Sequence, residues 1–107
     1  MSEPTDRRAE ERLLASPEAS CSFLSPVVEG FGPAKIKNIS AEGIGLLLSR
    51  RLEPGTLLAM TLSNPTHGFT KTVLVRVVHV TAQPGACLVG GTFNIPLSYQ
   101  ELTALVM

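Results

Sequence analysis

Two arginines four positions apart, Arg8 and Arg12, are the side chains of this sequence best suited to binding an anion. A guanidinium donates paired hydrogen bonds to phosphate, or to the O6 and N7 acceptors of guanine, and can also stack on a base. Two of them at this spacing can hold two points of one compact ligand. The same pattern fits a short solvated helix, because residues i and i+4 share a helical face. Glu10 and Glu11 lie between the arginines and would weaken the attraction for an anion.

A second polar group lies in residues 38–43, between two apolar runs, and contains Asn38, Ser40 and Gly43. Asn and Ser side chains hydrogen-bond nearby backbone, and Gly readily adopts φ > 0, so this segment is expected to form a corner between two strands. A corner of this kind can be purely structural. The arginine pair upstream supplies a matching cationic half, which makes the corner a candidate half of a binding site.

Composition limits the partners that the chain can have. It has 107 residues, enough for one domain, and a formal net charge of zero, which disfavours DNA, RNA and anionic membranes as partners. Cys21 and Cys87 form no CxxC motif and have no neighbouring histidine, so neither a metal nor a disulfide framework is expected. No apolar run is long enough to span a membrane and the first residues lack a signal sequence, which predicts a soluble cytoplasmic protein.

The apolar pattern predicts an all-β fold. Residues 1–6 are expected to be a disordered lead, followed by one domain over residues 7–107 that begins with an arginine-bearing arm, residues 7–14. Short β-prone runs separated by Gly and Pro turns predict strands over residues 19–28, 34–39, 44–48, 57–62, 71–81 and 86–93. Six such strands favour a small antiparallel β-barrel.

Three features of these elements can be tested directly. The run over residues 71–81 places His79 in phase with three valines and predicts a long, central, bent strand. Gly90 and Gly91 indicate a bulge or a close backbone approach in the last strand. Ser98 and Glu101 form a capping box that predicts a terminal helix over residues 98–106, lying across one end of the barrel, with Leu97 and Leu102 as a hydrophobic staple.

Signals for catalysis are weak. Neither His67 nor His79 is paired in sequence with a nucleophile or a set of metal ligands, and the sequence has no phosphate-binding GxxxxGK[ST] or GxGxxG motif. We therefore expect no enzymatic activity and no cofactor.

The two polar groups together resemble the paired motifs of the PilZ family, RxxxR followed by an Asp-x-Ser-x-x-Gly or Asn-x-Ser-x-x-Gly turn. PilZ domains are six-stranded barrels, and many are bacterial receptors for cyclic di-GMP. The resemblance implies that Arg8 and Arg12, helped by Arg7, hold phosphate and the guanine edge. It further implies ligand contacts from the three motif residues of the turn and a base contact from His79. Asn38 stands where Asp is commoner, which keeps hydrogen bonding but removes a negative charge.

The resulting hypothesis is a stand-alone cyclic di-GMP receptor. The ligand would bind between the arm and the turn, order the arm, and so signal to an unidentified protein partner. The alternative is a PilZ-like module that docks proteins and binds no nucleotide.

Overall fold

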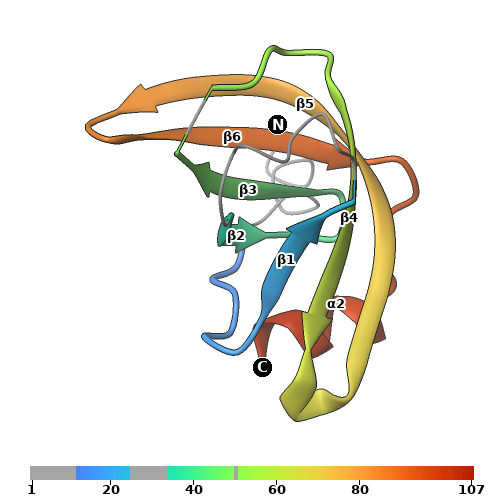
Figure 1. The fold of residues 1–107 in the computed structure, drawn as a ribbon. Helices are drawn as coiled ribbons and strands as arrows, with labels where there is room; N and C mark the ends of the chain where they lie inside the picture. The colour runs from blue at the N-terminus through green and yellow to red at the C-terminus, as the bar shows by residue number, and fades with distance from the viewer. Residues whose placement is uncertain (1–11, 25–33, 50) are drawn as a thin grey trace, which may run out of the picture.

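The computed structural model describes residues 12–24, 34–49 and 51–107. Six strands form one antiparallel sheet in the order β1-β4-β5-β6-β3-β2 (Figure 1). They are β1 (Ser20–Phe23), β2 (Lys35–Ile39), β3 (Gly43–Leu48), β4 (Leu57–Asn64), β5 (Phe69–Gln83) and β6 (Ala86–Phe93). A 3₁₀ helix, η2 (Pro65–His67), joins β4 to β5, and the chain ends in α2 (Tyr99–Val106).

Alternation along the strands builds the core on the concave side of the sheet. In β4 the burial alternates residue by residue, so that Leu58, Met60 and Leu62 are buried as the sequence pattern predicts. In β3 the side chains of Ile44 and Leu46 are also buried, and Gly43, Gly45 and Leu47 therefore lie on the outer face.

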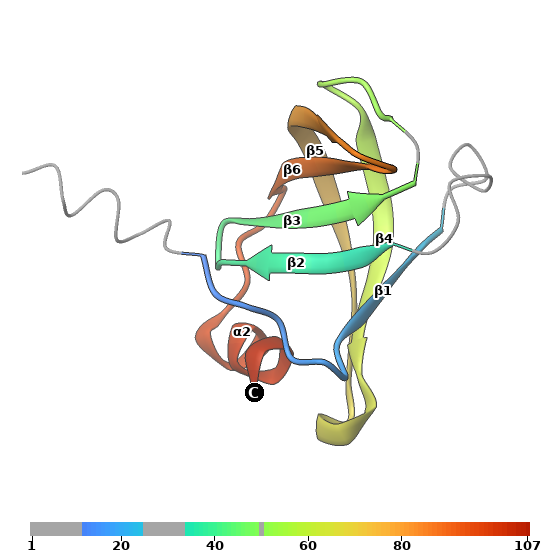
Figure 2. The same cartoon turned by 90° about the vertical axis from the view of Figure 1, so that its left-hand side faces the viewer.

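The sheet curls so that its two end strands approach each other. Strand β1 and the residue preceding β2 meet through one antiparallel bridge, between Cys21 and Ala34. Figure 2 shows the curled sheet from the side of β2 and β3, with α2 at one end of it. The prediction of six antiparallel strands and a C-terminal helix is confirmed, in the form of a curled half-barrel.

Strand β5 is long and bent, as expected, but His79 is not in phase with the buried valines. The register with β6 shifts between Val77 and His79, so that Val78 is an extra residue on β5 opposite Gly90 and Gly91. The bulge is therefore on the partner of the glycine-bearing strand. It turns His79 to the exposed, outer face. The alternation of buried and exposed residues therefore ends at Val77, although the sequence pattern predicted that it continues to His79.

The connection between β4 and β5 is regular structure, although the strands predicted on either side of it stopped at residue 62 and began again at residue 71. Strand β4 continues to Asn64, whose buried side chain accepts a hydrogen bond from the Thr66 backbone N–H and donates one to the Ala104 carbonyl. Gly68 then ends η2 in the left-handed region, with φ of 60°. One polar side chain thus fixes the hairpin and joins it to α2.

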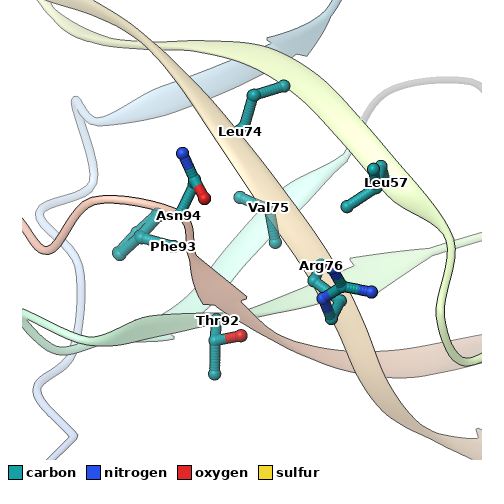
Figure 3. A pocket seen from close by; sticks show the side chains of 7 residues that line it. All are labelled: Leu57, Leu74, Val75, Arg76, Thr92, Phe93 and Asn94. Carbon is teal, nitrogen blue, oxygen red and sulfur yellow. The ribbon is translucent and has the colours of Figure 1, made fainter.

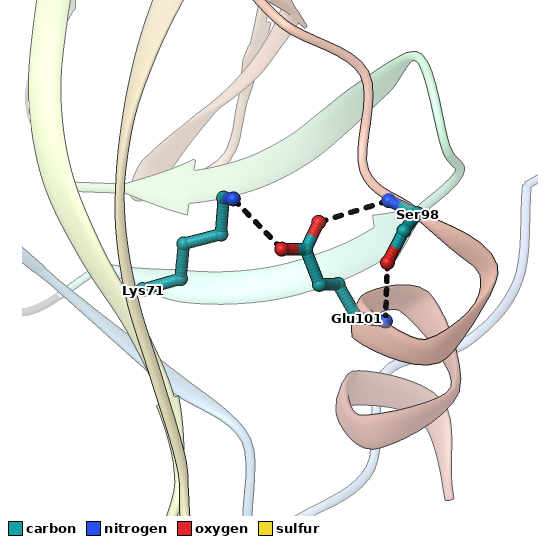
Figure 4. A network of polar contacts seen from close by, with 3 residues as sticks. All are labelled: Lys71, Ser98 and Glu101. Atoms are coloured by element: carbon teal, nitrogen blue, oxygen red, sulfur yellow. Dashed lines mark hydrogen bonds and ion pairs between the residues drawn. The ribbon is translucent and has the colours of Figure 1, made fainter.

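Helix α2 begins with the predicted capping box. Ser98 Oγ accepts from the Glu101 backbone N–H at 3.1 Å, and Glu101 Oε1 accepts from the Ser98 backbone N–H at 2.9 Å (Figure 4). Glu101 Oε2 also pairs with Lys71 Nζ of β5 at 2.7 Å. Leu97 and Leu105 are buried and Leu102 is partly buried against the same core, so α2 packs its apolar side on the sheet.

Candidate functional site

Arg12 lies beside the corner that carries the second motif. Its Nη1 donates to Asn38 Oδ1 at 3.2 Å. The contact is positioned by the next residue, Leu13, whose backbone N–H and carbonyl both bond to Ile39 at 2.8 Å. The described end of the arm is therefore extended along the edge of β2, and the helix interpretation does not hold there. Arg7 and Arg8 lie outside the described residues.

Ser40 holds the corner together. Its hydroxyl oxygen accepts from the backbone N–H groups of Glu42 at 3.2 Å and Gly43 at 3.1 Å, and its own N–H donates to the Gly43 carbonyl at 2.9 Å. The residue is 3% exposed. In this structure the side chain therefore serves the turn, and its contact with a ligand stays a prediction.

Gly43 is needed for a close approach, although the sequence suggested φ > 0. Positive φ among the described glycines occurs at Gly55, Gly68 and Gly85. At Gly43 a Cβ would overlap the backbone oxygen of Gly91 on β6, and it would lie 3.4 Å from Nη2 of Arg12. The absent side chain lets β6 approach on one side and the arginine on the other.

The strand register aligns a row of site residues across the outer face. Asn38 of β2 pairs with Gly45 of β3, Gly45 with Gly90 of β6, and Gly90 with His79 of β5. A Cβ at Gly45 would lie 2.6 Å from Asn38 Oδ1, and a Cβ at Gly90 would meet the His79 ring. The planar side chain of Asn38 therefore covers Gly45 at one end of the row, and the His79 ring covers Gly90 at the other.

A neighbouring row on the same face adds a second cation. Gly43 pairs with Thr92, and Thr92 pairs with Arg76 of β5. Arg76, Thr92 and Gly45 were not predicted as site residues, because their proximity depends on the pairing order β5-β6-β3. The spacing of Gly43 and Gly45 by two residues did carry a signal, since it places both on one face of a strand.

The chemistry available at these rows is hydrogen bonding, positive charge and ring stacking. Arg12 and Asn38 offer N–H donors, and His79 offers a ring on an exposed surface. Within the described ranges no group of three or more His, Cys, Asp or Glu residues could hold a metal ion. The arrangement suits a planar, anionic ligand.

Comparison with protein families identifies the family of this chain. The model of the PilZ domain matches residues 6–107, and the chain therefore belongs to the PilZ domain family. PilZ domains are generally binding modules for cyclic di-GMP and not enzymes. The comparison with curated proteins gave no match. In the part of the chain that the structure describes, no helix is both long and apolar enough to cross a membrane.

Proposed function

We propose that this protein is a cyclic di-GMP receptor that binds the dinucleotide on the outer face of β2, β3, β6 and β5. The observation that carries the proposal is the 3.2 Å hydrogen bond between Arg12 and Asn38, because it brings the end of the RxxxR motif to the start of the Asn-x-Ser-x-x-Gly corner. The family's general ligand supports the same assignment.

The ligand's chemistry suits the residues of this face. Cyclic di-GMP carries two phosphates and two guanines, so each arginine of the arm has either a phosphate or a guanine O6/N7 edge to bind in bidentate fashion. Asn38 would bond to a guanine edge, and the His79 ring would stack on a base. Gly43 and Ser40 keep the corner tight beneath these contacts.

The proposed signal is the ordering of the arm. Leu13 already bonds to β2 through both backbone groups, so the change would concern the residues before Arg12. We propose that the ligand fixes residues 7–11 on the outer face, with Arg7 and Arg8 completing the cationic half. A protein partner would then read a surface made partly by the arm.

Calorimetric titration with cyclic di-GMP tests the proposal. Arg12→Ala should weaken binding by about 1.5–3 kcal/mol, the range for hydrogen bonds to charged groups. Arg51→Ala is the matched control, because it removes the same charge from an exposed side chain whose only ion pair in the described ranges is a 3.9 Å contact with Glu53. Equal affinity of the two variants would place the site elsewhere. A wild-type protein that gives no heat at tens of micromolar ligand would instead support the nucleotide-free docking module.

A further inference from the structure

A hollow groove runs along the outer face of β5, beside the segment that follows β6. It consists of two adjoining hollows of about 240 and 260 Å³ that share Leu74 and Asn94. Figure 3 shows the first hollow, with Leu74 and Leu57 along one side and Asn94 opposite. The row of Asn38 and His79 does not contribute to its lining.

The groove is lined by large aliphatic side chains that remain in solvent. Leu57, Leu74 and Ile95 are 60%, 47% and 69% exposed. The two leucines come from adjacent strands, where Ala59 pairs with Leu74 and Leu57 with Arg76, and Ile95 follows β6. A gathering of exposed aliphatic residues around a hollow is typical of a protein interaction site, because covering it removes apolar surface from water.

The charged side chains that line the groove are all positive. Among the described residues, two cations, Arg76 and Lys71, line the hollows, and no carboxylate does. Lys71 is already neutralised by Glu101 at 2.7 Å. The Arg76 guanidinium forms no hydrogen bond or ion pair with any of the described residues, and it lies at one side of the hollow in Figure 3. A complementary partner therefore needs a carboxylate at that position.

We propose that this groove binds a short peptide segment of a partner protein, with aliphatic side chains against Leu57, Leu74 and Ile95 and a carboxylate paired with Arg76. A nucleotide would place polar phosphates against this apolar lining, whereas an acidic, aliphatic peptide matches both features. The exposed amide of Asn94 can bond to the peptide backbone. Arg76 and Thr92 of the second row also line the groove, but the proposal does not depend on nucleotide binding at the row of Asn38 and His79.

The test is a charge swap read by NMR on the full chain. The probes are short synthetic peptides with two leucines flanking one aspartate at varied spacing, and the same peptides with lysine in place of aspartate. We expect aspartate peptides to bind wild type and shift the amide resonances of Leu74, Asn94 and Ile95. Arg76→Glu should weaken these peptides about tenfold or more and favour the lysine set. Arg51→Glu, the matched control, should bind as wild type does.

Three outcomes would overturn the proposal. One is the absence of binding by any peptide of the set, and another is binding that shifts resonances away from the groove. The third is concentration-dependent dimerisation of the free protein that Leu74→Glu abolishes, since the occupant would then be a second copy. A parallel cyclic di-GMP titration of Leu74→Glu keeps this result separate from the nucleotide site, because Leu74 lines the groove and belongs to neither row of that site. Retained nucleotide affinity together with lost peptide binding would support the groove alone.

Discussion

Gly43 and Gly45 lie on the same outer face of β3, but a methyl group would meet a different obstacle at each. At Gly43 the obstacle is the backbone oxygen of Gly91, which moves only if the β3–β6 ladder moves. At Gly45 it is Oδ1 of Asn38, 2.6 Å away at the end of a flexible side chain. Substitution of Gly43 is therefore expected to affect mainly stability, and substitution of Gly45 mainly the geometry of the binding site.

Gly45→Ala should leave the free energy of unfolding within about 1 kcal/mol of wild type, since a side chain can rotate away. It should still weaken cyclic di-GMP binding, because the rotation takes Asn38 from its bond with Arg12. Gly43→Ala should lower stability by about 1–3 kcal/mol, the usual cost of forcing atoms into a packed site. Urea unfolding and calorimetric titration of both variants measure the two effects. Unchanged affinity in Gly45→Ala would show that the position of Asn38 does not matter for the ligand.

Cys21 gives a second residue-level prediction, for alkaline pH. Burial raises the pKa of its thiol from the ordinary value of 9.0 to about 11. The folded chain therefore holds the thiol proton more tightly than the unfolded chain does. The stability that this difference contributes is complete below about pH 9 and is lost as the pH rises through about 11. The loss should amount to ~2 kcal/mol between these limits. Cys21→Ala should lack this loss, and urea unfolding at several pH values measures the difference from wild type. An identical alkaline slope in both proteins would contradict the prediction.

At the scale of elements, the start of α2 predicts a response to acid. The hydrogen bond from Lys71 and that from the Ser98 backbone lower the pKa of Glu101 below its ordinary value. A lowered pKa means that the unfolded chain binds the proton more tightly, so stability is present above the ordinary pKa and is lost as pH falls through the lowered one. Glu101→Gln should be less stable than wild type at neutral pH, and this deficit should shrink as the pH falls below the ordinary carboxyl pKa of 4.5. Thermal unfolding across this pH range tests the prediction. Glu53→Gln is the control, because it makes the same exchange at an exposed residue. A stability deficit that does not change with pH would show that the negative charge of Glu101 is not what stabilises the start of α2.

The predictable elements were those whose signals are local. Alternation gave β4 and the concave face of β3, and the Ser98 to Glu101 spacing gave the start of α2, because the partners that fix these features lie within a few residues. The bulge at Val78 could not be read in the same way, since it depends on where β5 pairs with the two glycines of β6. The phase of His79 in the strand predicted that it lies with the buried valines. Only the family resemblance indicated that its ring is available to a ligand.

The candidate site followed the same division between local and long-range information. Asn38 and Arg12 were both recognised by type and motif, but their contact depends on Leu13 pairing with Ile39, a long-range bridge with no sequence signature. Arg76 was read as a residue in a β-prone run, because nothing in sequence connects it to the site. Its position opposite Thr92 is a property of the sheet order.

At the scale of the whole molecule, the corner of residues 38–43 links two other parts of the chain, the arm and α2. The arm bonds to Ile39 through Leu13 and then reaches α2, where the Ser16 N–H donates to the Leu105 carbonyl at 2.9 Å. From the corner itself, the carbonyl of Ala41 accepts from the Leu97 N–H at 2.8 Å, just before α2. The arm, the corner and the helix therefore form one connected set of backbone hydrogen bonds.

This connection predicts that cyclic di-GMP slows hydrogen exchange beyond the residues that it contacts. Ligand at a hundred times its Kd stabilises the folded state by about 2.7 kcal/mol, or ~100-fold in any exchange that requires release of the ligand. The amides of Leu13, Ile39 and Leu97 should show this slowing, because opening of the arm or corner breaks the site. Arg12→Ala at the same ligand concentration should show much less. Slowing confined to Ile39, with Leu13 and Leu97 unchanged, would mean that the corner binds alone and that the arm and helix carry no signal from it.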